Sequence, residues 1–219
     1  MKNPPTQLYL ISPLDVGGDF PQRLERALDA GKDFVTAFQF RVKGFDRPEQ
    51  QHEVARLAEP LQAICAARDV AFIVNDSVAL AKRLKADGVH LGRDDGDPRD
   101  AREELGREAQ IGVTCHASRH FAMDAGEAGA DYVAFGAFFD STTKDKGDAQ
   151  RPTPELIEWW AEVFEIPVVA IGGITPENCG TLVEAGADFI ATCGAVWNTD
   201  EVAAVEAFRE AVERAENRA

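Results

Sequence analysis

Three polar side chains alternate near the end of one apolar segment and could together hold an anion. Gln39, Arg41 and Lys43 occupy every second position there, so in an extended strand they point to the same face. Arginine can hold a phosphate through two parallel hydrogen bonds, and lysine adds a point charge. The pattern predicts an anion-binding strand end, and a strand end that is simply solvated is the alternative.

Two polar pairs after the next two apolar segments could hold a divalent cation. Asn75 and Asp76 follow one segment directly, and Asp94 and Asp95 follow the next. Magnesium usually takes one or two protein carboxylates together with phosphate oxygens and water. Helix capping would explain Asp76 and Asp95 equally well, because each precedes a segment of helical pattern.

The segment 140–151 is polar, charged and longer than the other connections. It contains Ser141, Thr143 and Lys144, whose hydroxyls and ammonium group could close over a pyrophosphate. Long loops in compact domains are commonly functional lids or irregular segments. An ordinary polar loop is the alternative interpretation.

Two glycine-containing turns near the end of the chain are suited to a phosphate group. Gly173 follows the seventh apolar segment, and Cys193 and Gly194 follow the eighth. Glycine lets the backbone approach an anion closely, and the N–H groups at the start of a helix attract negative charge. Thr175 and Pro176 are then expected as the N-cap and the first residue of a helix.

Two other groups are weaker candidates. His116 and His120 have the spacing of two ligands on one helix face, but the glutamate of H-E-x-x-H and a clear third ligand are missing, so zinc is not expected. Trp159 and Trp160 are adjacent in a helical segment and are typical of packing. The apolar side chains around them are also a candidate contact for a homo-oligomer.

The candidate residues follow apolar segments of strand length, which alternate with segments of helical pattern. The expected strands are Leu8–Ser12, Phe34–Arg41, Ala71–Asn75, Gly88–Leu91, Gln110–Thr114, Tyr132–Gly136, Val168–Ile171 and Phe189–Thr192. The expected helices include Arg47–Ala67, Pro98–Leu105, Arg119–Ala128, Pro154–Phe164 and Pro176–Ala185. Eight such units predict an α/β fold, a (β/α)8 TIM barrel. An open doubly wound sheet is the alternative, and the lack of G-x-G-x-x-G after the first strand disfavours it.

A short motif recurs where helices lead into strands, as Ala86-Asp87-Gly88, Ala130-Asp131-Tyr132 and Ala187-Asp188-Phe189. Its recurrence favours a closed ring of equivalent units that forms one domain over residues 1–219, with a core from about residue 8 to about residue 217. Active sites of such barrels lie at the carboxyl ends of the strands. The candidate residues follow those ends, so we expect them to meet on one face.

The 219 residues carry a formal net charge of −15, and 45% of them are hydrophobic. The acidic excess argues against nucleic acid and anionic membranes as partners, while the apolar content suffices for a sizeable core. Four widely spaced cysteines without a C-x-x-C pair indicate reduced thiols in a cytoplasmic protein. Neither a signal peptide nor a transmembrane stretch is expected. An anionic substrate would need a local cluster of positive charge.

Six motifs in order resemble the thiamine-phosphate synthase family, over nearly the whole chain. They are Gln39-Phe40-Arg41-Val42-Lys43-Gly44, Asn75-Asp76, Asp87-Gly88-Val89-His90-Leu91-Gly92 with Asp95, Gly112-Val113-Thr114-Cys115-His116, Thr143-Lys144 and Ile171-Gly172-Gly173-Ile174. No single motif is decisive, but six in register are specific.

The resemblance implies a magnesium-dependent enzyme with phosphorylated small molecules as its partners. The family joins hydroxymethylpyrimidine pyrophosphate to hydroxyethylthiazole phosphate, and it is thought to lose pyrophosphate first, giving a pyrimidine methyl cation that the thiazole nitrogen traps. Such a step depends on charge stabilisation at the leaving group more than on a general base.

The family pattern also implies a role for each candidate residue. The pyrimidine pyrophosphate would contact Gln39, Arg41, Lys43, Asn75 and Thr114. Asp76 and Asp95 would ligate Mg²⁺. Thr143 and Lys144 would meet the pyrophosphate and the thiazole phosphate, and Ser141 would be a further substrate contact. Gly173, Cys193 and Gly194 would bind the thiazole phosphate. The catalytic residues would be Arg41, Lys43, Thr114 and Lys144.

The chain departs from the family pattern at several positions, and each departure could weaken a substrate contact. These positions are Val42, Arg93, Asp140-Ser141 and Cys193-Gly194. A related thiazole tautomerase is one alternative, because His116 falls where that family has a catalytic histidine, but it would need neither magnesium nor a pyrophosphate clamp. A barrel that binds thiamine precursors without turnover is the other alternative.

Overall fold

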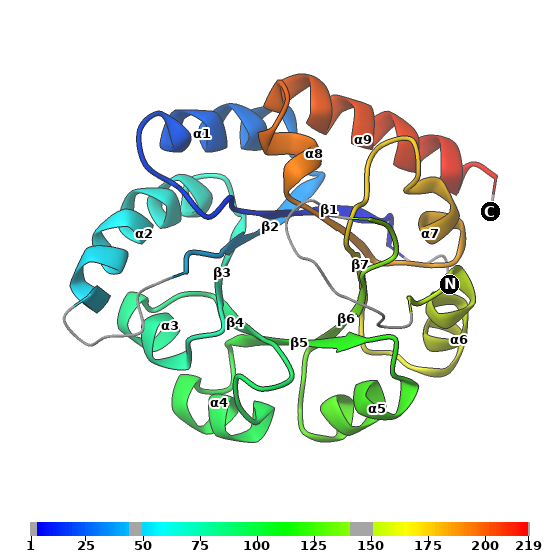
Figure 1. Cartoon of the computed structure of the whole chain (residues 1–219), viewed down its shortest axis with the longest axis horizontal. Helices are drawn as coiled ribbons and strands as arrows, with labels where there is room; N and C mark the ends of the chain where they lie inside the picture. Colours follow the sequence, from blue (N-terminus) through cyan, green and yellow to red (C-terminus); the bar gives the residue numbers. More distant parts are fainter. Residues whose placement is uncertain (1–3, 44–49, 141–150, 219) are drawn as a thin grey trace.

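The computed structural model describes residues 4–43, 50–140 and 151–218. Eight parallel strands pair in chain order and close into one barrel, with β1 against β8 (Figure 1). The strands are β1 (Gln7–Ile11), β2 (Val35–Phe40), β3 (Ala71–Asn75), β4 (Gly88–Leu91), β5 (Gln110–His116), β6 (Tyr132–Gly136), β7 (Val168–Ile171) and β8 (Phe189–Thr192). The predicted TIM barrel is therefore confirmed.

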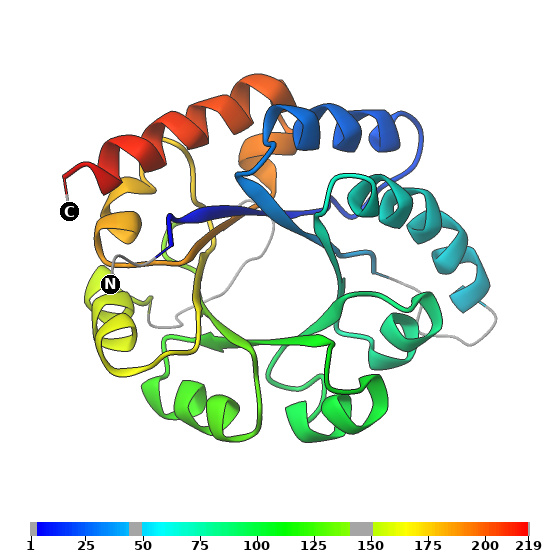
Figure 2. The same ribbon diagram turned by 180° about the vertical axis from the view of Figure 1, so that it is seen from behind.

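Helices surround the strands on every side, as both views along the barrel show (Figures 1 and 2). They are α1 (Phe20–Ala30), α2 (Gln51–Ala66), α3 (Val78–Leu84), α4 (Pro98–Leu105), α5 (Arg119–Glu127), α6 (Pro154–Val163), α7 (Gly180–Glu184), α8 (Gly194–Trp197) and α9 (Glu201–Glu216). Among the described residues, no helix combines the length and apolarity that crossing a bilayer requires.

Alternate residues of the strands contribute to two separate apolar layers. A large cluster, which includes Leu10 and Phe72, packs between the strands and the helices. A small cluster, which includes Tyr9, Ile73 and Val169, fills the interior of the barrel. Because both strand faces are buried, the strands appear in the sequence as nearly continuous apolar segments.

The recurring aspartate of the helix-to-strand motif has one structural role at three places. Asp87 accepts a hydrogen bond from the N–H of Phe72 at 2.7 Å. Asp131 accepts one from the N–H of Ile111 at 2.6 Å, and Asp188 one from the N–H of Val168 at 2.8 Å. Each carboxylate thus ties the start of its own strand to the start of the preceding one, which explains why the motif recurs around the ring.

Most of the predicted elements are confirmed, but the helix after β7 begins later than predicted. The expected Pro176–Ala185 is α7, Gly180–Glu184, with Cys179 at the N-cap position. Thr175 therefore is not the N-cap. Its N–H instead donates to Oδ1 of Asn178 at 2.8 Å in a turn that comes before the helix.

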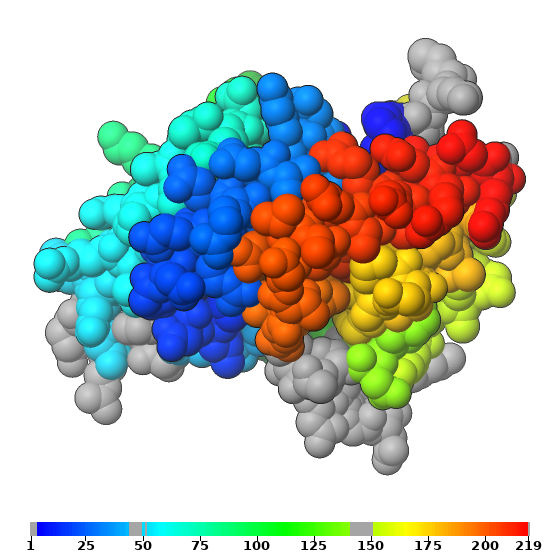
Figure 3. All heavy atoms as spheres, turned by 90° about the horizontal axis from the view of Figure 1, so that it is seen from above, coloured from blue at the N-terminus to red at the C-terminus, as the bar shows by residue number. Residues whose placement is uncertain are grey.

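The last helix closes the ring against the first. Figure 3 shows α9, in red, lying beside α1 in blue and α7 in yellow. At its start, the buried Glu201 accepts a hydrogen bond from Arg23 at 2.9 Å and another from Arg26 at 2.8 Å. At its end, Glu216 accepts a hydrogen bond from the N–H of Thr6 at 2.6 Å. The first and last described segments are thereby joined.

The two tryptophans differ in burial. Trp160 is fully buried, stacks on Phe164 and donates its indole N–H to the carbonyl of Ile166 at 2.7 Å. Trp159 is half-buried beneath the guanidinium of Arg119, which lies 4.4 Å from the ring centroid. Packing therefore accounts for Trp160, and the homo-oligomer remains a prediction.

Candidate functional site

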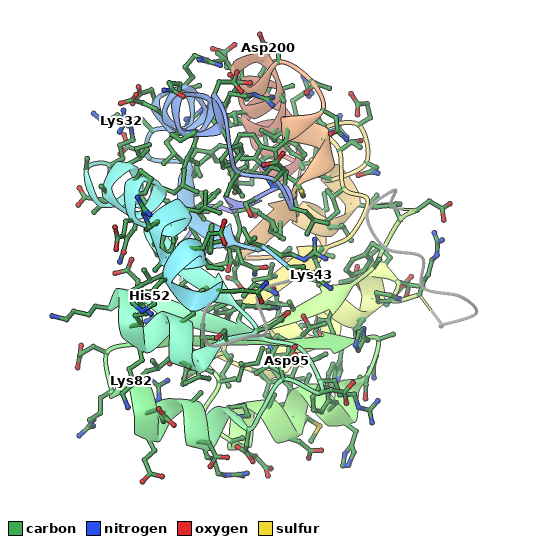
Figure 4. The ribbon with its side chains drawn as sticks, turned by 60° about the vertical axis from the view of Figure 1, so that its left-hand side comes forward. Lys32, Lys43, His52, Lys82, Asp95 and Asp200 are labelled. Carbon is green, nitrogen blue, oxygen red and sulfur yellow. The ribbon has the colours of Figure 1, made fainter. Side chains whose placement is uncertain are left out.

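Of the three alternating polar residues, Gln39 lies in β2 and is buried, while Arg41 and Lys43 lie after β2 at the barrel mouth. Gln39 is buried, and its Nε2 donates to the hydroxyl of Tyr9 at 3.2 Å. Arg41 and Lys43 follow the end of the strand, half-buried and exposed respectively. Figure 4 shows Lys43 and Asp95 on the same side of the barrel, with Lys32 toward the other. Arg41 and Lys43 thus lie at the mouth and Gln39 lies inside the barrel, and the contact of all three with an anion stays a prediction.

Ser12 connects Arg41 to the turn after β8. The Arg41 N–H donates to Oγ of Ser12 at 2.8 Å, and the thiol of Cys193 donates to the Ser12 carbonyl at 3.5 Å. Burial raises the pKa of the Cys193 thiol, and the positive charge of Arg41 partly opposes that rise. The predicted anion grip and the predicted phosphate turn are therefore neighbours.

Asp76 lies at the end of β3 in an unusual backbone conformation. Its φ of 63° falls in the left-handed region, which non-glycine residues rarely adopt and which often occurs at functional sites. Its N–H donates to the carbonyl of His90 on β4 at 2.8 Å. Ser77, and not Asp76, caps α3 by accepting a hydrogen bond from the N–H of Leu80. Helix capping therefore does not account for Asp76.

Asp95 lies in the turn after β4, and capping does not account for it either. Asp97 caps α4, whereas Oδ2 of Asp95 accepts a hydrogen bond from the N–H of Gly92 at 2.8 Å. A Cβ atom on Gly92 would clash with that carboxylate. The turn thus holds Asp95 by one oxygen beside the end of β4, the strand that pairs with β3.

Among residues 4–43, 50–140 and 151–218, no group of three or more His, Cys, Asp and Glu side chains is placed to hold a metal ion. His116 ends β5 and His120 lies in α5, so they do not share a helix face. His120 instead lies 3.6 Å from Asp124. A cation at Asp76 and Asp95 would therefore need ligands from substrate or water.

The glycine turn after β7 packs closely on the backbone that follows β6. Gly172 and Gly173 have φ values of 101° and 66°, and a Cβ on Gly173 would clash with the backbone of Phe139 and Asp140. Asn178 donates from Nδ2 to the Gly173 carbonyl at 3.1 Å. The turn is thus held in the form that only glycine adopts without strain.

A chain of hydrogen bonds inside the barrel was not predicted from the sequence, apart from its two ends. It runs from Gln39 to Tyr9, from Tyr9 to Tyr132 at 2.9 Å, from Tyr132 to Nδ1 of His90 at 3.0 Å, and from Nε2 of His90 to Thr114 at 2.8 Å. The first four side chains are at most 8% exposed, and Thr114 is half-buried. We call these five residues the buried hydrogen-bond chain.

The positions that depart from the family pattern have their own partners. Asp140 forms an ion pair with Arg151, which lowers the pKa of that carboxyl and offsets its charge. The guanidinium of Arg93 lies 5.5 Å from the ring centroid of Phe121. Val42 packs against the outer core. The predicted ligands Ser141, Thr143 and Lys144 lie outside the described residues.

A groove of about 790 Å³ on the other end of the barrel is a poor site for an anion. Its wall includes two lysines, Lys82 and Lys85, and four acidic residues: Asp69, Asp87, Glu104 and Glu108. Lys82 is already 3.1 Å from Glu104. The acidic side chains therefore disfavour an anionic ligand in this groove.

Comparison with known proteins identifies the family of the chain. A sequence model described as thiamine monophosphate synthase matches residues 8–196. The chain belongs to the thiamine monophosphate synthase family. It is accordingly an enzyme, a transferase.

Two curated relatives from this family cover nearly the whole chain. The thiamine-phosphate synthase of Erythrobacter litoralis (strain HTCC2594) is 79% identical over 208 residues, which are 95% of this chain and 96% of the relative. That of Rhodospirillum centenum (strain ATCC 51521 / SW) is 51% identical over 193 residues, 88% and 89% of the two chains. Among solved structures, a thiamine phosphate pyrophosphorylase from Pyrococcus furiosus has a TM-score of 0.81 at 31% identity, covering 95% of this chain and 96% of that one.

Proposed function

We propose that this transferase joins hydroxymethylpyrimidine pyrophosphate to hydroxyethylthiazole phosphate with the help of Mg²⁺, giving thiamine phosphate and pyrophosphate. The observation that carries the proposal is that the Arg41 backbone and the Cys193 thiol both bond Ser12, while the positive charge of Arg41 acts on that thiol. This supports a cation beside the turn proposed for the phosphate. Relatives with 79% and 51% identity that are named thiamine-phosphate synthase support the same reaction.

The pyrophosphate end of the substrate lies, in this proposal, against the ends of β2, β3 and β5. Arg41 and Lys43 supply positive charge, with Lys144 as a third cation from the loop. Asn75 and Thr114 offer an amide and a hydroxyl, both half-buried at strand ends. Gln39, which is buried and bonded to Tyr9, contacts the same substrate from inside the barrel in this proposal.

Mg²⁺ fits the two carboxylates at the ends of β3 and β4. Neither Asp76 nor Asp95 caps a helix, because Ser77 and Asp97 do so. Mg²⁺ usually takes one or two protein carboxylates when it also binds phosphate oxygens. When bound, the ion would supply positive charge to the pyrophosphate. The hydrogen bond from Gly92 orients Asp95 for that purpose and leaves its second oxygen available.

The thiazole phosphate lies, in this proposal, at the two turns after β7 and β8. Gly173, Cys193 and Gly194 contribute backbone there, and a phosphate at these two loops is common in barrels of this type. The turn after β8 adjoins Arg41 through Ser12, so in this proposal the two substrates meet at the mouth.

The reaction balances without a general base. The bond between the pyrimidine methylene carbon and the pyrophosphate oxygen breaks, and its electron pair leaves with the pyrophosphate. The lone pair of the thiazole nitrogen then forms the new carbon–nitrogen bond. The protein groups that matter most are those that stabilise the leaving anion: Arg41, Lys43, Lys144 and the hydroxyl of Thr114.

The test is formation of thiamine phosphate from the two purified substrates, measured by chromatography, with magnesium and then with excess EDTA. We expect product with magnesium, loss of product with EDTA, and recovery when magnesium is returned in excess. Release of one pyrophosphate for each thiamine phosphate checks the stoichiometry.

A folded protein that makes no product under these conditions would overturn the proposal. Binding of each substrate alone, by calorimetry, would then separate a barrel that binds thiamine precursors without turnover from one that does not bind them. Conversion of a thiazole tautomer would identify the alternative in which His116 is the catalytic residue.

A further inference from the structure

The buried hydrogen-bond chain joins side chains from five strands. Tyr9, Gln39, His90, Thr114 and Tyr132 come from β1, β2, β4, β5 and β6 in turn. Among the described residues, no buried side-chain nitrogen or oxygen lacks a hydrogen-bond partner. A fully paired polar chain inside an apolar barrel fixes the orientation of its members, because a broken bond would leave a buried polar atom unpaired.

The barrel is shaped to hold the middle of this chain. A Cβ on Gly112 would overlap the ring of Tyr132, so glycine at that position makes room for the tyrosine. The rings of His90 and Tyr132 stack with centroids 5.6 Å apart and planes 25° apart. Tyr9 meets Tyr132 edge to face at 6.1 Å. The packing of the Tyr9, Tyr132 and His90 rings therefore fixes the positions of the polar atoms that form the hydrogen bonds.

Each member of the buried hydrogen-bond chain donates its proton to the next member, from Gln39 toward Thr114. The amide Nε2 of Gln39 can only donate, so the Tyr9 oxygen accepts. Burial raises the pKa of Tyr9 to about 12 and that of Tyr132 well above its usual value, so both hydroxyls keep their protons near neutral pH. Since Tyr9 accepts from Gln39, its own proton needs an acceptor. Within the part of the chain that the structure describes, that acceptor is the hydroxyl of Tyr132.

The same direction of donation fixes which ring nitrogen of His90 carries the proton. Tyr132, which accepts from Tyr9, donates its own proton to Nδ1 of His90. A ring nitrogen that accepts carries no proton, so the proton of His90 is on Nε2, and Nε2 donates to Oγ1 of Thr114. Among residues 4–43, 50–140 and 151–218, the opposite direction would leave the proton of Tyr9 without an acceptor.

We propose that Tyr9, Tyr132 and His90 are positioning residues that present the hydroxyl of Thr114 as a hydrogen-bond donor to an anionic oxygen of the substrate. Because Thr114 accepts from His90, its own proton is left for a group bound at the mouth. The inference rests on the proposed function, in which that group is the leaving pyrophosphate. A donor fixed before the reaction stabilises developing charge without reorganising during the step.

The first test reads the tautomer of His90 and needs no substrate. In protein labelled with ¹⁵N-histidine, long-range proton–nitrogen correlation distinguishes a bare Nδ1 from a protonated one, and a His90→Gln variant assigns the signals among the four histidines. We expect a bare Nδ1 and a protonated Nε2, and loss of that preference in Tyr132→Phe, which keeps the ring but removes the donor. A proton on Nδ1 in the unaltered protein would overturn the inference.

The second test reads kcat and KM. Tyr132→Phe and Thr114→Val should each lower kcat about 10- to 100-fold with little change in KM, since the lost bond acts on developing charge. The double variant should lose no more than Thr114→Val alone, and Thr114→Ser should restore the activity that valine removes. If the kcat losses of the two single variants multiply in the double variant, the two residues act independently, and the inference that they act as one unit fails.

Thr36→Val is the matched control for these variants. It deletes a threonine hydroxyl that donates to Gln7 at 2.8 Å, near the start of β2 and apart from the buried hydrogen-bond chain. Its activity should remain that of the unaltered enzyme. If the unaltered enzyme makes no thiamine phosphate, the proposed function fails, while the tautomer of His90 still supports or overturns the inference by itself.

Discussion

Arg41 is the residue on which the proposed grip on pyrophosphate depends most. It lies half-buried at the mouth, its backbone is fixed by Ser12, and its charge influences the thiol of Cys193. Lys43 is exposed and can adapt, whereas the planar guanidinium can hold two phosphate oxygens at once. The loss of Arg41 should therefore be more costly than the loss of a surface cation.

We expect Arg41→Ala to lower kcat/KM for the pyrimidine pyrophosphate about 100- to 1,000-fold, because it removes a donor that stabilises the leaving anion. Steady-state kinetics would measure the change. Arg99→Ala is the matched control, since Arg99 is exposed on α4 and the change in charge is the same. Equal activity of the two variants would refute the assigned role.

Asp76 and Asp95 can be tested through the magnesium requirement. We expect Asp76→Asn and Asp95→Asn to raise the magnesium concentration for half-maximal rate at least about tenfold, because each removes one negative ligand. Asparagine keeps an oxygen that can accept from the Gly92 N–H, so the turn at Asp95 should persist.

The control for this titration is Asp100→Asn, which alters an exposed aspartate in the first turn of α4. It should leave the magnesium dependence unchanged. Identical titrations for all four proteins would show that these carboxylates do not bind the ion.

Residue types alone could indicate the mouth but not the interior of the site. Arg41, Lys43, Asp76 and Asp95 could be proposed because each follows an apolar segment, and the carboxyl ends of barrel strands meet on one face. Tyr9 and Tyr132 looked like ordinary strand residues, and only the closed barrel brings their hydroxyls to 2.9 Å across 123 positions of sequence. Pairing across a barrel depends on register, which the residue types of a single strand do not specify.

At the scale of elements, the strands were predictable because burial on both faces leaves continuous apolar segments. The start of α7 was not, since Thr175 and Pro176 have the residue types of a helix start but the chain makes a turn there first. Asn178 is the cause, because its side chain bonds both the Thr175 N–H and the Gly173 carbonyl. A side chain that competes with the backbone in this way delays the helix.

Glu201 holds the start of α9 against α1 through Arg23 and Arg26. Its carboxylate is buried, which raises its pKa, but the hydrogen bonds from Arg23 and Arg26 together outweigh that effect, so the pKa is lowered from its usual 4.5. We expect Glu201→Gln to reduce the free energy of unfolding by about 1–3 kcal/mol near neutral pH, because it removes the charge that pairs with Arg23 and Arg26. The loss is limited because Arg26 is half exposed and solvent screens its contribution.

The pH dependence of Glu201→Gln has a definite sign. A carboxyl whose pKa is lower in the folded state stabilises the protein above its unfolded pKa, and the stabilisation disappears as the pH falls through the folded pKa. The two proteins should therefore converge in stability below a pH of about 4.5. Urea denaturation across this range measures the effect, with exposed Glu206→Gln as control. A constant difference at all pH values would contradict the assignment.

The whole molecule carries a net charge of −15, yet its proposed substrates are anions. The long-range field should repel them, while Arg41 and Lys43 attract them at short range. Added salt screens the long-range repulsion first, because charges far apart are screened more than charges in contact. A moderate rise in ionic strength should therefore help binding rather than weaken it.

We expect the KM for the pyrimidine pyrophosphate to fall as monovalent salt rises from about 20 to about 150 mM at saturating magnesium. The KM for the thiazole phosphate, which has less charge, should fall less. Choline chloride in place of sodium chloride controls for specific ions. A KM that rises from the lowest salt onward would mean that the positive mouth dominates the field.

The hydrogen bond between Thr6 and Glu216 holds the first and last described segments close together, so the ring could be opened at another place. A short peptide joining these two segments, with new chain ends opened between the exposed residues Lys32 and Asp33, would give a circular permutant. Those ends would fall where α1 leads into β2, away from the mouth. Such a permutant should fold and keep the parent's kcat, and its unfolding would show whether the barrel needs β1 to form first.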